Sequence, residues 1–98
     1  MKVSYRNRKI EKVCTNAQAA RKTYGATMAG KIHKRIDQLQ SSDSVEIMIQ
    51  SRIGRCHPLM GDRENQYALD LEHPYRLIFT KKGDEIQIAE VQEIIDYH

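Results

Sequence analysis

The chain has 98 residues, of which 40% are hydrophobic and 30% are charged, and its formal net charge is +3. This composition is ordinary for a folded domain and unlike that of a disordered chain. No apolar run approaches the length that spans a bilayer, and the basic N-terminal segment is not followed by the apolar core of a signal peptide. We therefore expect one domain, spanning residues 1–98, in a cytoplasmic protein with no membrane partner.

Charge is unevenly distributed along the sequence. Residues 1–40 contain ten basic and two acidic residues, a net charge of +8, whereas residues 41–98 contain six basic and eleven acidic residues, a net charge of −5. Such an asymmetry indicates a polyanion or an acidic protein as a partner for the basic part. A solvated helix face rich in lysine and arginine explains the same pattern, so charge alone leaves all three interpretations open.

The first elements expected are a strand and a long helix. Residues 2–7, "KVSYRN", alternate apolar and polar side chains, which is typical of a short strand. Thr15 and Asn16 can cap a helix, and apolar residues then recur at spacings of three and four as far as Leu39. Gly25 predicts a bend or break in this helix.

The middle of the chain is less distinct. Residues 45–50, "VEIMIQ", fit helix and strand patterns alike. We favour a short helix, because Asp43 or Ser44 can cap it and a helical hairpin would cover one face of a sheet. Residues 56–63, "CHPLMGDR", are expected to form a loop or strand.

The last third is predicted to be β-structure. Residues 67–71 alternate, residues 75–80 are strongly apolar, and "KKGD" predicts a hairpin turn at Gly83. Residues 85–95 form a further strand whose alternation breaks once, and a bulge near Ala89 would restore its phase. The expected class is α+β: a small antiparallel sheet with an N-terminal helical hairpin packed on one face.

The two cysteines, Cys14 and Cys56, lie far apart in the sequence. In a reducing cytosol they are expected to be free thiols. No paired CxxC or HxxxH spacing accompanies them, so we expect no metal site and no cofactor.

Titratable side chains gather where the predicted strands end. RNA can be cleaved without a metal when its 2′-hydroxyl attacks the adjacent phosphate, which requires a base, an acid and a cation for the phosphorane. Taken singly, each group also has an ordinary role: a histidine before proline can cap a turn, a tyrosine can pack on the core and a terminal histidine can be solvated. The candidate groups are His57, Asp62, Arg63, Arg76, Asp96, Tyr97 and His98.

Two segments together resemble a known family. "CHPLMGDRENQYALDLEHPYRLIF" and the terminal "EIIDYH" are similar to HigB-type toxins of type II toxin–antitoxin modules, within the RelE/ParE superfamily, and the likeness extends over nearly the whole chain. The resemblance implies a RelE/ParE-like α+β toxin that enters translating ribosomes and cleaves mRNA. It also implies, as partner, a helix-turn-helix antitoxin of the HigA type.

The resemblance assigns roles to particular residues. It gives acid–base work to His57, Asp96, Tyr97 and His98, and contact with the phosphate to Arg76 and Arg63. We expect the last strand to pair inside the sheet, so that its end is anchored and the terminal trio lies on the concave face beside His57 and Arg76. For additional contacts with RNA phosphates we expect basic side chains of the helical region and of the segment before His57, namely Lys31, Lys34, Arg35 and Arg55.

Two positions depart from the family pattern. Met60 stands where many relatives carry lysine, and Glu72 where some carry a basic residue. Fewer cations would slow cleavage unless Arg55 or Arg63 compensated. Two alternatives therefore stay open: a toxin of the same superfamily that blocks a protein such as DNA gyrase, and an inactive homologue that only binds protein.

Overall fold

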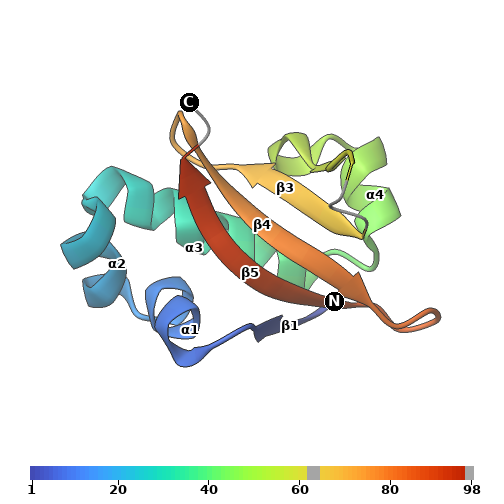
Figure 1. Ribbon diagram of the computed structural model, residues 1–98, viewed down its shortest axis with the longest axis horizontal. Helices are drawn as coiled ribbons and strands as arrows, with labels where there is room; N and C mark the ends of the chain where they lie inside the picture. Colours follow the sequence, from blue (N-terminus) through green and yellow to red (C-terminus); the bar gives the residue numbers. More distant parts are fainter. Residues whose placement is uncertain (62–64, 97–98) are drawn as a thin grey trace.

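The computed structural model describes residues 1–61 and 65–96. It is an α+β fold in which helices cover one face of a five-stranded sheet (Figure 1). Arg63, Tyr97 and His98, together with Asp62, lie outside the described residues. The elements in chain order are β1 (Lys2–Tyr5), α1 (Arg8–Thr15), α2 (Ala17–Tyr24), α3 (Ala26–Ser41), α4 (Val45–Gln50), the 3-10 turn η1 (Ile53–Arg55), β2 (His57–Pro58), β3 (Gln66–Asp70), β4 (Tyr75–Lys82) and β5 (Ile88–Asp96).

The helical region begins earlier than the sequence predicts. The Asn7 side chain accepts a hydrogen bond from the Ile10 amide at 3.0 Å and caps α1, a helix that the sequence analysis missed. Asn16 ends α1 and also caps α2, accepting from the Ala19 amide at 3.0 Å. The predicted break at Gly25 is confirmed: this residue has φ +88° and separates α2 from α3. The expected hairpin is thus preceded by one further helix.

Residues 45–50 form the short helix α4, as favoured from the sequence. The Ser44 hydroxyl accepts a hydrogen bond from the Ile47 amide at 3.2 Å. Val45 and Met48 are fully buried, so the helix contributes one apolar side to the core. The Val45 amide donates to the side-chain oxygen of Gln87 at 2.9 Å, which ties the start of α4 to the segment before β5.

The sheet has the strand order β1-β5-β4-β3-β2. Neighbouring strands from β2 to β5 are antiparallel, whereas β1 pairs in parallel with β5, so the sheet is mostly but not entirely antiparallel. The hairpin between β4 and β5 has Gly83 at φ +82°, as predicted.

The bulge lies three residues beyond the predicted position. Ile78 is opposite Glu93 and Phe79 is opposite Val91, which leaves Gln92 as the extra residue of β5. The position near Ala89 was predicted by counting Ile86 and Ile88 as the apolar side of the strand, but Ile86 is 77% exposed. The buried residue in this part of β5 is Ala89. Its side chain is too small to stand out in the apolar pattern, so the sequence did not reveal which residues of the strand face the core.

The hydrophobic core lies between the helices and one face of the sheet. Figure 1 shows α3 passing behind β4 and β5, on the opposite side from the viewer. The largest fully buried side chains of the core come from α3, α4 and the central strands: Ile32, Leu39, Met48, Leu69, Leu77, Phe79, Val45 and Val91. Within the described ranges, none of the helices has the length and apolar character needed to cross a bilayer.

Both cysteines are free and buried. Burial raises the pKa of the Cys14 and Cys56 thiols to about 12. Neither side chain is therefore a ready nucleophile at neutral pH.

Candidate functional site

The face of the sheet that carries no helix holds two of the predicted site residues. Side chains alternate along each strand, so strand pairing decides which residues share this face. His57 is opposite Ala68, which is opposite Ile78. Two residues further along β3, and so on the same face, Asp70 is opposite Arg76. His57, Asp70 and Arg76 therefore lie on the helix-free face. The backbones of His57 and Arg76 are roughly 12 Å apart, since two strand spacings and an offset of two residues along the strand separate them.

The ring of His57 is held by its own main chain. Its Nδ1 donates a hydrogen bond to the Arg55 carbonyl at 2.8 Å. A carbonyl oxygen can only accept, so Nδ1 carries the proton and Nε2 is left without one in the neutral ring. Arg55 has φ +52°, in the left-handed region that few non-glycine residues adopt. The backbone strain at Arg55 thus accompanies the contact that fixes the tautomer of His57.

Asp70 is the centre of an ionic cluster. Its carboxylate accepts two hydrogen bonds from Arg55, with Nε to Oδ2 at 2.6 Å and Nη2 to Oδ1 at 3.0 Å. Arg76 also faces it, with Nε 3.5 Å from Oδ1. Burial by itself would raise the pKa of Asp70, but the hydrogen bond and charge of Arg55, together with the charges of Arg76 and His57, outweigh it and lower the pKa.

Arg55 was expected to contact RNA phosphate, and in the structure its guanidinium is paired with Asp70. The two hydrogen bonds of this pair raise the pKa of Arg55. Arg76 makes the longer of the two ion pairs, and 29% of its side chain is exposed. A phosphate that approached this face would therefore meet the guanidinium of Arg76 beside the paired Arg55 and Asp70.

The prediction that Arg35 contacts RNA was wrong. This residue was expected on an RNA-binding surface, but only 8% of it is exposed. Its Nε donates to the Asp70 carbonyl at 2.6 Å and its Nη1 to the Gln38 side chain at 2.9 Å. A side chain at Gly54 would lie 2.9 Å from the Arg35 Nε. Arg35 therefore joins α3 to β3 and η1, and burial lowers its pKa.

The two lysines of α3 do not join the site. Lys31 is half-buried and Lys34 is exposed, both on a helix that covers the opposite face of the sheet from His57 and Arg76. The sheet thus separates these lysines from the proposed catalytic groups.

The end of β5 is anchored, as the sequence analysis expected, because Asp96 is opposite Tyr75 in the sheet. Its side was predicted wrongly. Ile95, not Asp96, is opposite Arg76, so alternation places Asp96 on the same side as Ile94, towards the helices. The bulge at Gln92 is the physical reason, because one extra residue reverses the phase of the rest of the strand.

Sequence reasoning missed Asp70, although the sequence contains a signal for it. In a hairpin, residues equally distant from the turn pair with one another. Asp70 and Arg76 are equally distant from His73, in the connection between β3 and β4, so their opposite charges could have been paired in advance.

Metal-ligating residues do not gather in this structure. Within residues 1–61 and 65–96, no three His, Cys, Asp or Glu side chains lie close enough together to hold an ion.

Comparison with known proteins supports the fold. No family model matches the sequence, and no curated protein matches it. Among solved structures, the chain is similar to a YoeB/ParE toxin from Agrobacterium tumefaciens, with a TM-score of 0.68 and 17% sequence identity over 100% of both chains. The fold is therefore RelE/ParE-like: N-terminal helices on a mostly antiparallel five-stranded sheet.

Proposed function

We propose that this protein is the toxin of a type II toxin–antitoxin module, of the HigB type, and that it cleaves mRNA on the ribosome. The observation that carries the proposal is the position of His57 and Arg76 on the helix-free face of the sheet, with the Nε2 of His57 available to accept a proton. The RelE/ParE-like fold, shared with a YoeB/ParE toxin, supports the same class.

The proposed reaction needs neither metal nor water. The RNA 2′-hydroxyl gives its proton to His57 Nε2 as the 2′-oxygen bonds to phosphorus, and Arg76 stabilises the negative charge of the phosphorane. The bond from phosphorus to the 5′-oxygen then breaks, and an acid protonates the leaving oxygen. The products are a 2′,3′-cyclic phosphate and a 5′-hydroxyl. We assign the acid to the terminal Tyr97 and His98, and a second phosphate contact to Arg63.

Arg76 must exchange partners for this reaction to proceed. In the structure its Nε lies 3.5 Å from Asp70, whereas Arg55 holds the same carboxylate at 2.6 Å. Asp70 keeps Arg55 as a counter-ion when Arg76 turns to a substrate phosphate. The expected partners of the protein are thus the ribosome with its mRNA and, for neutralisation, a HigA-type helix-turn-helix antitoxin, all in the cytoplasm.

The test is controlled expression in growing bacteria, with 5′ ends mapped along one translated message. The parent protein is expected to arrest growth and to produce new 5′-hydroxyl ends within the translated region. His57→Ala is expected to reduce cleavage about 10²–10⁴-fold, the usual contribution of a general base. Arg21→Ala, which removes an exposed cation of α2, is the matched control. Cleavage by His57→Ala at the rate of the parent would refute the proposed base.

A second candidate is a superfamily toxin that acts by binding a protein such as DNA gyrase. The observation in its favour is that Asp70 already pairs with both Arg55 and Arg76. Growth arrest without message cleavage, together with trapped DNA-cleavage complexes on purified gyrase, would select this function. An inactive homologue would cause neither effect.

A further inference from the structure

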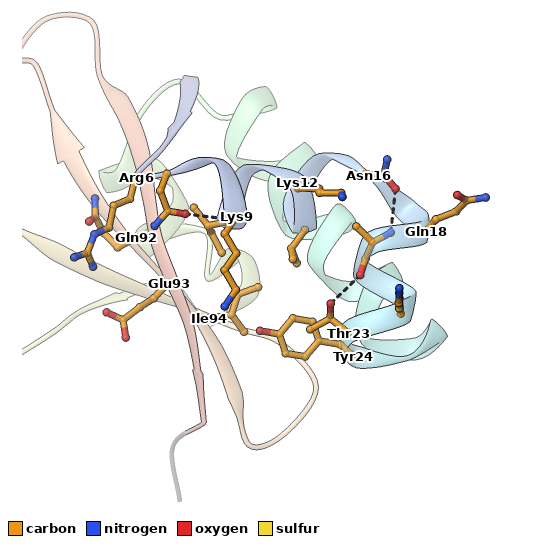
Figure 2. A pocket seen from close by; sticks show the side chains of 15 residues that line it. Arg6, Lys9, Lys12, Asn16, Gln18, Thr23, Tyr24, Gln92, Glu93 and Ile94 are labelled. Carbon is orange, nitrogen blue, oxygen red and sulfur yellow. Dashed lines mark hydrogen bonds between the residues drawn. The ribbon is translucent and has the colours of Figure 1, made fainter.

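A groove of about 800 Å³ lies on the other side of β5, between that strand and helices α1 and α2 (Figure 2). Its lining includes an apolar group of side chains from both helices and from the strand. In Figure 2 the Tyr24 ring points from α2 towards β5. The apolar lining residues are Ile10, Val13, Ala19, Tyr24 and Ile94.

The same groove has a basic rim made of Arg6, Lys9, Lys12 and Lys22. The acidic lining residue is Glu93, and Figure 2 shows its side chain on the opposite side of β5 from Tyr24. Among the residues that the structure describes, none of the four basic side chains forms an ion pair within 4.0 Å, although the charge of Arg6 acts on Glu90. The groove is therefore apolar inside and positively charged at its border.

The edge of β5 that lines this groove is only partly paired. β1 is in register with β5 from Ile88 to Val91, and the Arg6 amide donates to the Val91 carbonyl at 2.9 Å. Within residues 1–61 and 65–96, no strand continues this pairing from Gln92 to Ile95. Outward-pointing amide and carbonyl groups of these residues are thus available to another strand.

We propose that this groove binds an extended acidic segment of a partner protein, which adds to β5 as a strand along Gln92–Ile95. Alternate side chains of that segment would be apolar and face the groove interior, and the others would be carboxylates that face the basic rim. Four residues of strand cover roughly 13 Å. Single-stranded nucleic acid would complement the charge but would leave the strand edge unpaired.

This surface is independent of the proposed nuclease site. Ile94 faces the helices, whereas His57 and Arg76 lie on the helix-free face. The inference therefore goes beyond the proposed function, and a peptide-binding experiment can fail or succeed whatever the result of the cleavage experiment.

The test uses the whole protein and a fluorescein-labelled seven-residue peptide that alternates glutamate and valine, with binding followed by fluorescence anisotropy. We expect saturable binding that weakens about tenfold or more when Lys9→Glu and Lys12→Glu are combined. The matched control combines Arg8→Glu on α1 with Arg21→Glu on α2, which makes the same charge change at exposed positions outside the groove. This control should change the affinity less than about threefold.

Two further measurements separate strand addition from general charge attraction. Methylation of alternate peptide nitrogens should weaken binding about tenfold, because it removes the main-chain donors. Amide hydrogen exchange of residues 93–95 in the parent protein should slow when the peptide is bound, and this measurement does not depend on a variant that folds.

The proposal would be overturned by absence of peptide binding, by equal losses in the two double variants, or by unchanged exchange at residues 93–95. A 2′-O-methyl RNA of twelve nucleotides provides the remaining comparison. If that RNA binds, if Lys9→Glu with Lys12→Glu abolishes its binding, and if the acidic peptide does not bind, the groove is a nucleic-acid site instead.

Discussion

The arginines on the two faces of the sheet are bound in different ways, although those of both faces contact Asp70. From the helix-covered face, buried Arg35 donates to the Asp70 main-chain carbonyl. On the helix-free face, the carboxylate of Asp70 pairs with Arg55 and Arg76, whose side chains are 59% and 29% exposed. A buried cation that donates to a main-chain carbonyl stabilises the fold and cannot turn to a ligand. A cation bound to a partly exposed carboxylate can exchange that partner for a substrate anion.

The largest expected effect tests the apolar part of the covered face. Phe79 is fully buried and stacks with Tyr67 at 5.5 Å between ring centroids. Phe79→Ala should lower the free energy of unfolding by about 3–5 kcal/mol, because it leaves a cavity that the packed helices cannot fill. Urea denaturation followed by far-UV circular dichroism measures the change. A loss below 1 kcal/mol would show that the helices do not pack on this face as described.

Arg35 provides the next prediction. Arg35→Ala removes the donors to the Asp70 carbonyl and to Gln38 inside the protein, so we expect a loss of about 2–4 kcal/mol in unfolding free energy. Lys34→Ala, exposed on the same helix, should change it by less than about 0.5 kcal/mol. Equal effects of the two substitutions in urea denaturation would place Arg35 at the surface and would remove the contrast between the faces.

Asp70→Asn tests the helix-free face through pH. The pKa of Asp70 is lower in the folded protein than its ordinary value of 3.8, so the ionised carboxylate stabilises the fold above about pH 4. That contribution is lost as the pH falls through the folded-state pKa. Since the ion pairs are partly exposed, Asp70→Asn should cost only about 1 kcal/mol at pH 7. The gap between the parent and the variant should narrow at pH 2.5, and a gap that widened there would contradict the lowered pKa.

The smallest effect is expected at a surface ion pair. Lys82 Nζ lies 2.9 Å from Glu90, and 57% of the lysine side chain is exposed. Lys82→Ala should lower the unfolding free energy by about 0.5 kcal/mol or less, because solvent screens this pair. Urea denaturation at low and high salt gives the measurement. A change as large as that of Arg35→Ala would show that exposure does not distinguish the ion pairs of this protein.

Much of the fold could be predicted from apolar spacing, caps and turns. The break at Gly25, the helix α4 and the turn at Gly83 each depend on local signals that tertiary contacts did not override. Helix α1 was missed although Ile10, Val13 and Cys14 form an apolar stripe, because that stripe spans little more than one turn and the Asn7 cap before it was not considered. The parallel pairing of β1 with β5 has no local signal, since it joins distant segments.

The candidate site was predictable only in part. Strand alternation and the family resemblance placed His57 and Arg76 on one face, and the structure agrees. Arg35 was misplaced because a helical pattern does not reveal that a charged side chain finds an interior main-chain acceptor. Asp96 was assigned to the wrong side because the bulge lies at Gln92 and not near Ala89, so the side chains after it point to the opposite faces from those predicted. The position of the bulge depends on packing and not on the sequence period.

The parallel pair between β1 and β5 has a consequence for synthesis. Lys2 emerges from the ribosome early, but Ile88, its partner in the sheet, emerges late. Until then the helices have no complete sheet to cover, so the nascent chain completes its fold only after β5 has been synthesised. Protease resistance of stalled nascent chains of increasing length would locate the point at which folding is completed.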